Sequence, residues 1–464
     1  MYKIQYYGWF SYEMWEFFML PIWLIIIYFI ARFAIVRPNL FDKPYYKYYV
    51  SGLFVKLIGA ISVCMIYTIY YTDGGDTTSY FECASTICNL LVKHPLNGLH
   101  VLFGEANMEN IFLFDSETGY PYRFMYLDTQ TFTLIRILTP FVLIGCKSFL
   151  ITAVLLAWAS YMGIWKLYEL FISYYPMLSR QFAISILFVP SVFFWGSGIL
   201  KDTVTLSASC WFVFGLHKFF IEKKYFSRYF VIVVLSATVV VFIKPYIFIT
   251  LLPGSIMWVL LQRLINSPNR RLVVIYLPII YGMSLITGLF ILSKLGNVMS
   301  KFSLDQIAST AVATQKDLKQ SYYGSNSFDL GEFDGSVTSF LSKAPIAMNA
   351  GLFRPYIWES KNVVMALSGL ENLCILGLTV LIFVRIKIRR IFSILINNPL
   401  LFFSVSYSMF FSFAVGLTTS NFGALVRFKI PFLPFYVSSL FILTYFIDKH
   451  RALQIANQKK NAFG

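Results

Sequence analysis

The residues best suited to chemistry are two aspartates in the stretch YYTDGGDTTSYF, residues 70–81. Asp73 and Asp76 follow an apolar run of about twenty residues, which is long enough to cross a bilayer. The Gly-Gly pair between them permits a sharp turn of the backbone. A carboxylate placed here can accept a proton from a substrate hydroxyl. Asp76 also precedes a helical pattern and suits the N-cap of a helix, so the local sequence supports both roles.

Cationic side chains recur where predicted membrane spans end, and an ionisable group there is costly unless it is hydrated or paired. Lys201 follows the small residues of WGSG, residues 195–198. Backbone N–H groups and a positive charge would therefore meet at the start of a helix, which suits a phosphate. Lys244 lies in a short turn between two apolar runs. The simpler interpretation is that both lysines extend to lipid headgroups, and the alternatives stay open.

Two segments nearer the C-terminus carry similar residues. The segment LFRPYIWE contains Arg354 and Glu359 with aromatic residues between them. An arginine can bind phosphate with two parallel hydrogen bonds, and an aromatic shelf suits sugar stacking, although Trp and Tyr are also ordinary interfacial anchors. Arg427 and Lys429 stand at the start of the last predicted span. An anionic lipid substrate would explain why cations gather at one predicted membrane face.

The composition identifies an integral membrane protein. Hydrophobic residues make up 58% of the 464 residues and charged residues 13%, and the mean hydropathy is +0.67. Repeated apolar runs predict an all-α, polytopic transmembrane bundle that forms a single domain, 1–464. The net charge of +16 is typical of cationic cytoplasmic connections rather than of nucleic-acid binding, so no nucleic acid is expected as a partner.

Eleven spans are predicted, with short cationic connections on one side of the membrane. They are 12–35, 49–71, 148–172, 181–195, 203–220, 229–243, 247–265, 272–292, 363–384, 399–417 and 431–446. The segment 131–146 is too short and is broken by Pro140, which favours an interfacial or half-buried helix. The positive-inside rule then places the N-terminus outside and the C-terminus in the cytoplasm. We expect a bacterial inner membrane.

Two long connections fall on the predicted outer face. They are the acidic loop 72–147 and the loop 293–362, which together contain 14 of the 22 Asp and Glu residues. Long connections in membrane proteins are uncommon unless they are functional. We expect both to carry short amphipathic helices, with the chemistry in the first loop and a lid in the second.

This layout resembles the GT-C superfamily of integral membrane glycosyltransferases, which use polyprenyl-phosphate-linked sugars. Members typically carry an acidic residue in the first external loop with a tyrosine a few residues later, and GGDTTSY supplies Asp76 and Tyr80 in that arrangement. The segments PSVFFWGSGILKD and LFRPYIWESKN also look similar to parts of bacterial membrane proteins grouped with such transferases or with polysaccharide polymerases. One departure is that an extra span precedes the acidic loop here.

The resemblance implies a transfer with inversion, in which Asp76 is the general base and the leaving group is a lipid phosphate. Cations would stabilise that phosphate. Asp73 would position the acceptor or hold a divalent cation. No other metal or cofactor is implied. The remaining residues of the implied binding site are Tyr80, Lys201, Lys244, Arg354, Glu359, Arg427 and Lys429.

Two other functions stay open. An O-antigen-type polymerase would use repeats linked to a lipid pyrophosphate and would rely on external arginines. A lipid or polysaccharide transporter is less favoured, because transporters usually carry ionisable groups at mid-membrane and internal repeats. Glu371, inside the ninth predicted span, is the exception.

Overall fold

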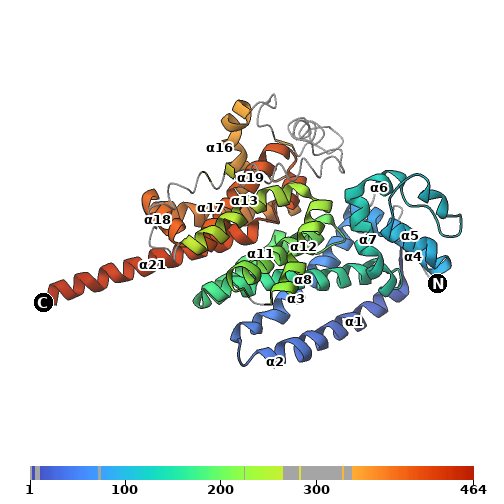
Figure 1. The fold of residues 1–464 in the computed structure, drawn as a ribbon, viewed down its shortest axis with the longest axis horizontal. Helices are drawn as coiled ribbons and strands as arrows, with labels where there is room; N and C mark the ends of the chain where they lie inside the picture. The colour runs from blue at the N-terminus through green and yellow to red at the C-terminus, as the bar shows by residue number, and fades with distance from the viewer. Residues whose placement is uncertain are drawn as a thin grey trace. The chain divides into compact units, whose positions relative to one another are not determined.

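The described part of the chain is almost entirely helical in the computed structural model (Figure 1). The description covers residues 3–5, 11–71, 75–223, 225–264, 279, 282–283, 327–328 and 337–463. Within these ranges the strands are β1 (Lys3–Gln5) and β2 (Ser11–Glu13), which pair antiparallel. Asp73, most of the predicted span 272–292 and most of the predicted loop 293–362 lie outside the described residues.

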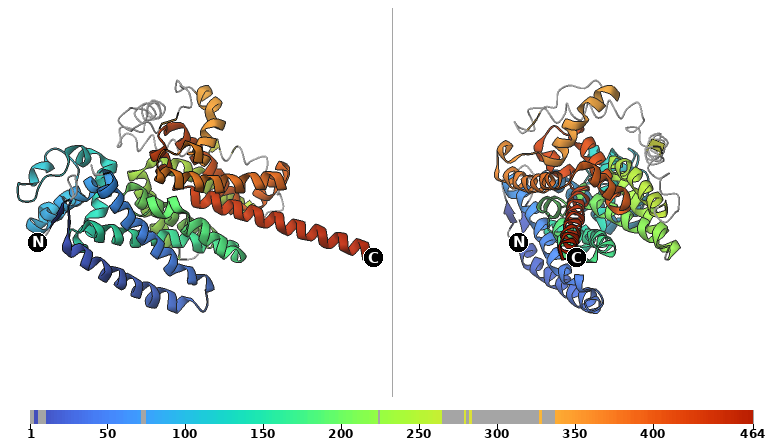
Figure 2. Two further views of the ribbon diagram at one scale, coloured as in Figure 1. Left: turned by 180° about the vertical axis from the view of Figure 1, so that it is seen from behind. Right: turned by 90° about the vertical axis from the view of Figure 1, so that its left-hand side faces the viewer.

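The longer helices follow the apolar runs of the sequence. They are α1 (Met14–Phe29), α3 (Tyr49–Met65), α4 (Asp76–Lys93), α7 (Thr129–Ile144), α8 (Phe149–Tyr174), α11 (Lys201–Leu216), α12 (Phe226–Ile243), α13 (Pro245–Leu264), α16 (Val337–Phe353), α17 (Val363–Arg385), α19 (Pro399–Thr418) and α21 (Leu433–Phe463). The shorter helices are α2 (Arg37–Asn39), α5 (Pro95–Phe103), α6 (Arg123–Leu127), α9 (Ser179–Phe182), α10 (Pro190–Trp195), α18 (Ile388–Asn397) and α20 (Phe422–Phe428). The long α21 is red in Figure 2.

Eight helices in the described part of the chain are long and apolar enough to cross a membrane. They are Met14–Asn39, Pro44–Tyr70, Phe149–Tyr174, Lys201–Ile221, Phe226–Ile243, Pro245–Leu264, Val363–Arg385 and Pro399–Thr418. The bent pair of α20 and α21, with 67° between its two helices, makes a ninth if it is one span. Large apolar side chains are exposed along α1, α12 and α17, and this surface suits contact with lipid. The protein is thus an integral membrane protein.

One predicted span, 181–195, is wrong. The structure has three short pieces there: α9, a π-helical turn over Ala183–Leu187, and α10. The chain leaves the helical state at Phe188 and resumes at Pro190. Proline has no N–H to donate, and it disfavours helical geometry in the residue before it. The apolar run over 181–195, which at about fifteen residues is already short for a span, is therefore divided and is not among the candidate spans of the described residues.

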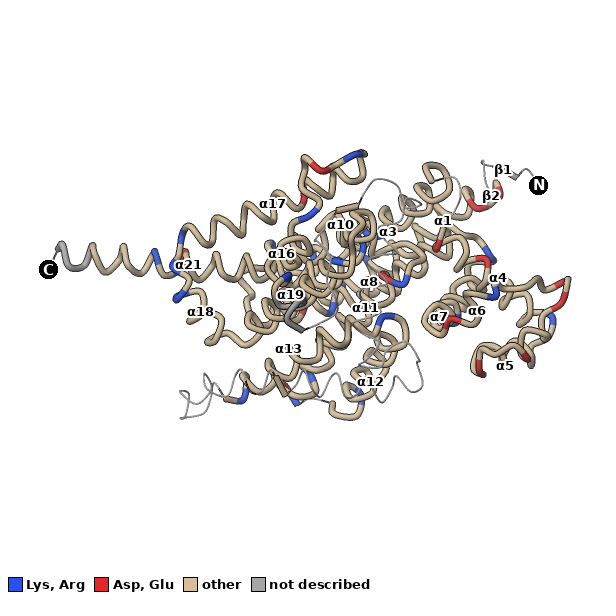
Figure 3. The backbone as a smooth tube through the Cα atoms, turned by 90° about the horizontal axis from the view of Figure 1, so that it is seen from above, with Lys and Arg blue, Asp and Glu red and all other residues tan. Residues whose placement is uncertain are grey.

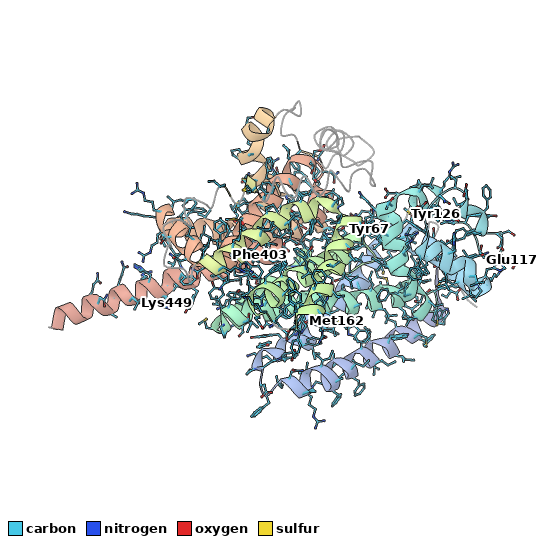
Figure 4. All side chains as sticks on the ribbon, in the orientation of Figure 1. Tyr67, Glu117, Tyr126, Met162, Phe403 and Lys449 are labelled. Atoms are coloured by element: carbon cyan, nitrogen blue, oxygen red, sulfur yellow. The ribbon has the colours of Figure 1, made fainter. Side chains whose placement is uncertain are left out.

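The described chain separates into two compact units. The first unit contains 1–170, 192–215 and 230–245, and the second contains 171–191, 216–229 and 246–464. In the first unit, α4 packs against α5 and α7. In the second, α16 and α17 pack with α19 and α21, and Phe403 lies in the aromatic core (Figure 4), 5.3 Å from Trp258 between ring centroids.

The start of α4 depends on Gly75. Its φ of +152° is one that side-chain-bearing residues rarely adopt, and a Cβ there would approach the Tyr67 ring to 2.8 Å. The Gly75 N–H donates to the hydroxyl of Thr78 at 3.0 Å. Gly75 therefore occupies the N-cap position expected for Asp76, which is instead the first helical residue. A carboxylate in the first turn still interacts favourably with the helix dipole.

In the second unit, α16 and α19 approach each other closely because glycines lie at the contact. A methyl group on Gly416 would overlap the carbonyl of Ala347, and one on Gly351 would overlap the carbonyl of Ser412. Small residues that let helix backbones approach are the usual basis of helix association in membranes. This contact therefore depends on the absence of side-chain atoms at both positions.

Gly416→Ala should lower the thermal stability of the purified full chain in detergent. The added methyl must displace the α16 backbone, and overpacking of this kind costs about 1–3 kcal/mol. The matched control is Gly377→Ala in α17, where nothing lies within 4 Å of the added carbon. That change should raise stability by up to about 1 kcal/mol, because alanine favours helix. Equal melting temperatures for the two variants would contradict the close approach.

Candidate functional site

Two lysines and two aspartates occupy the region where α11 begins in the first unit. Lys244, just after α12, donates to Asp202 Oδ1 at 2.5 Å. Both side chains of this pair are buried, with 9% of Lys244 and 1% of Asp202 exposed. Removing one partner of a buried pair leaves an uncompensated charge. The immediate partner of Lys244, predicted as a phosphate ligand, is therefore a carboxylate of the same unit.

Lys201, the first residue of α11, is more accessible, with 18% of its side chain exposed. Its ammonium group donates to Thr131 Oγ1 at 2.7 Å and lies 3.7 Å from Asp128 Oδ2. Asp128 in turn accepts hydrogen bonds from Thr131 N at 3.0 Å and Oγ1 at 2.6 Å, and so caps α7. The starts of α7 and α11 therefore meet in one polar network.

Asp76 is exposed at the start of α4 and belongs to the same electrostatic neighbourhood. Lys201 is attracted by Asp128 and more weakly by Asp76, and it is repelled by Lys244. We refer to Asp76, Asp128, Thr131 and Lys201 as the Lys201 cluster. It joins an exposed carboxylate, which can accept a proton, to a cation that can receive an anionic group. Tyr80, one turn along α4, is buried at 5% exposure.

Sequence reasoning missed Asp128, although a signal for it exists. An aspartate directly before a helical pattern is a typical helix start, and DTQTF at 128–132 has that form. The capping role alone would not reveal the lysine partner, because Lys201 lies 70 residues beyond Thr131. Only the tertiary structure joins the two helix starts.

Other carboxylates of the acidic loop have local structural roles. Asp115 accepts hydrogen bonds from the backbone N–H of Thr118 at 2.7 Å and of Glu117 at 2.8 Å, which lower its pKa. Glu82 accepts a hydrogen bond from the Tyr122 hydroxyl at 2.6 Å, and this bond raises the pKa of Tyr122 to about 12. These contacts hold the loop together, and Asp76 and Asp128 are the described loop carboxylates that interact with Lys201.

The WGSG segment before α11 is buried, and its polar groups bond within the protein. Lys56 of α3, with 2% exposure, donates to the carbonyl of Gly196 and to Ser197 Oγ, the latter at 3.4 Å. Thr203 Oγ1 donates to the carbonyl of Gly198 at 2.6 Å. The sequence analysis did not identify Lys56, although a lysine inside an apolar run was its signal. Lys56 therefore supplies a hydrogen-bond donor to the Gly196 carbonyl, which lies at the helix break before Lys201.

In the second unit, Arg354, Glu359 and Lys429 come together. The Arg354 guanidinium is 3.2 Å from Glu359 Oε1 and lies over the Phe328 ring at 4.9 Å. Lys429 is completely buried and donates to the Arg354 carbonyl at 3.1 Å and to the side chain of Asn372. This is the Arg354 cluster. Its charges are thus hydrogen-bonded or paired within the unit.

Two more predicted residues can be placed in the second unit. Arg427 lies in the last turn of α20 and is partly exposed. Glu371, inside α17, accepts hydrogen bonds from Ser191 N at 2.7 Å and Ser191 Oγ at 2.6 Å. Glu371 therefore helps to satisfy the N-terminus of α10, which begins at Pro190.

The described residues contain no group of three or more His, Cys, Asp or Glu side chains arranged to hold a metal ion. No protein-family model matches the chain, and searches of curated proteins and of solved structures also gave no match. The class that the fold defines is therefore an integral membrane protein with eight or nine candidate spans. Its chemistry must be inferred from the two clusters.

Lys56→Met should destabilise the protein by about 1–3 kcal/mol, because the buried Gly196 carbonyl loses a hydrogen-bond donor. Thermal unfolding of the full chain in detergent measures this. Lys43→Met is the control, since that lysine is exposed and its removal leaves no buried group without a donor. Equal stability of the two variants would show that Lys56 does not support the break.

Proposed function

We propose that this protein is a membrane glycosyltransferase. It transfers a sugar from a polyprenyl-phosphate-linked donor to a lipid, glycan or protein acceptor at the outer face of a bacterial inner membrane. The observation that carries the proposal is the Lys201 cluster. Asp76 begins α4, which follows the candidate span Pro44–Tyr70, and Lys201 is the first residue of the candidate span Lys201–Ile221. A carboxylate and a cation at span ends suit a substrate with a polar head and an apolar tail.

Asp76 is the general base in this proposal. Its carboxylate accepts the proton of the acceptor hydroxyl while that oxygen attacks the anomeric carbon of the donor sugar. The bond from this carbon to the phosphate oxygen breaks, and the lipid phosphate leaves with the electron pair. General-base assistance contributes about 10²–10⁴-fold. The exposure of Asp76 supports access by an acceptor.

Lys201 is the preferred ligand for the leaving phosphate. Developing negative charge is stabilised best by a cation already held in place, and Thr131 and Asp128 hold this ammonium group. Lys201 is also more exposed than Lys244, at 18% against 9% of the side chain. We assign Lys244 to the support of Asp202 at the start of α11. Asp73 remains the candidate for acceptor positioning or for a divalent cation.

An O-antigen-type polymerase is the second candidate, and the Arg354 cluster favours it. Arg354 keeps 25% of its side chain exposed while Glu359 and Phe328 orient it. A guanidinium held in this way can bind a pyrophosphate through two parallel hydrogen bonds. Arg427, which is partly exposed, would add a second cation to this binding region, while Glu359 and the buried Lys429 would hold Arg354 in place. Product length separates the two activities, because a polymerase yields a ladder of repeats.

A lipid or polysaccharide transporter is the third candidate. Ionisable residues within candidate spans usually mark transport pathways, and Lys56 and Glu371 are such residues. Both make hydrogen bonds to groups at the ends of α10. A supporting role for the broken helix therefore accounts for them without a transport step, and we rank transport below transfer.

Asp76→Asn should reduce sugar transfer by about 10²–10⁴-fold while donor binding stays intact, because only the proton acceptor is lost. The assay follows transfer from a polyprenyl-phosphate sugar by the full chain in proteoliposomes. Glu109→Gln is the control, since it removes an exposed carboxylate from the same predicted loop. Comparable activity of Asp76→Asn and the control would exclude Asp76 as the base.

The two lysines should respond differently to substitution. Lys201→Gln should weaken binding of a fluorescent polyprenyl phosphate without a large loss of stability. Lys244→Met should instead lower stability by about 3–5 kcal/mol, because it removes the cation from a buried ion pair with Asp202. Donor affinity and melting temperature are measured on the same samples. Unchanged donor affinity in Lys201→Gln would remove Lys201 from the phosphate site.

A further inference from the structure

A basic groove lies in the second unit where α17 ends and α18 and α21 meet. Its volume is about 640 Å³. The charged side chains that line it are Arg385, Lys387, Arg389, Arg390, Arg451 and Asp448. Figure 3 shows Lys and Arg gathered where these three helices come together. The groove is therefore an open depression with an excess of positive charge.

The cations of the groove are accessible. Lys387, Arg389, Arg390 and Arg451 are exposed. Arg385 lies 3.9 Å from Asp448, and these two side chains are 49% and 63% exposed. Such an open ion pair contributes little to stability. Five cations against one carboxylate thus leave a surface that can bind an anion.

The adjacent helix α18 places this groove at the level of the lipid headgroups. Its apolar side chains fall on one face, where Ile391 is buried while Ile388 and Phe392 are 52% and 58% exposed. Arg389 and Arg390 fall on the opposite, polar face by helical spacing. A strongly amphipathic helix with cations on its polar face lies in the membrane interface. α18 also joins two candidate spans, α17 and α19.

We propose that the basic groove binds the phosphate of an anionic membrane phospholipid. Arginines from α17, α18 and α21 contact the phosphate oxygens, and the acyl chains cover Ile388 and Phe392. Basic pockets between membrane helices favour phospholipid headgroups in this way. The positive-inside rule explains why cations occur in such connections, but it does not require three helices to enclose them in one groove. This site is independent of the proposed sugar transfer.

Lipid binding to the purified full chain in detergent tests the proposal by native mass spectrometry. Phosphatidylglycerol should bind more tightly than phosphatidylcholine, and Arg389→Gln with Arg390→Gln should weaken phosphatidylglycerol by about fivefold per removed cation. Lys449→Gln is the matched control. Lys449 (Figure 4) follows Asp448 on α21 and does not line the basic groove, so its removal should leave the preference unchanged.

Three results would overturn the proposal. One is equal affinity of the unmodified protein for the two lipids. A second is an unchanged preference in the double variant when it melts at the normal temperature. If that variant does not fold, Arg451→Gln on α21 replaces it, with the same expected loss. The third is that soluble pyrophosphate binds as tightly as phosphatidylglycerol and is lost in the same variants, because the groove would then select a soluble anion.

Discussion

A polar group inside hydrocarbon must find its partner within the protein, and the broken helix before α11 shows how this chain meets that requirement. At one end of α10, Lys56 bonds to the carbonyl of Gly196, and at the other, Glu371 accepts from Ser191. The ends of a short helix would otherwise leave several backbone groups unsatisfied. Charged residues inside candidate spans therefore stabilise the segment that leads to Lys201.

The apolar runs predicted most of the helices, because the length and hydropathy of a helix are properties of residues that are adjacent in sequence. The spans predicted around α1, α3, α8, α11, α12, α13, α17 and α19 coincide with helices that are long and apolar enough to cross a membrane. The span predicted over 181–195 failed because the run is short for a span and its helix is interrupted before Pro190. The N-cap prediction failed by one residue, because the unusual φ of Gly75 depends on its packing against Tyr67 and not on composition.

The candidate sites were predicted less completely, since their geometry depends on contacts between distant residues. Asp76 and Lys201 were predicted from their residue type and their position at span ends. Asp128 was not predicted, because its sequence context indicates a helix cap and gives no sign of its contact with Lys201. It also treated Lys244 as available for phosphate, whereas the structure pairs it with Asp202 across 42 residues. Residue type limits which reactions a side chain can take part in, and tertiary contacts decide which charged side chains are already paired within the protein.

The buried pair of Asp202 and Lys244 also has an evolutionary consequence. Loss of either charge alone breaks a buried ion pair, which is costly in a low-dielectric environment, so substitutions at the two positions should be coupled. We expect relatives of this chain to vary the two positions together, with an acid at the start of one span and a cation after the next. Such a coupled pair is a fingerprint by which distant relatives of this chain can be recognised.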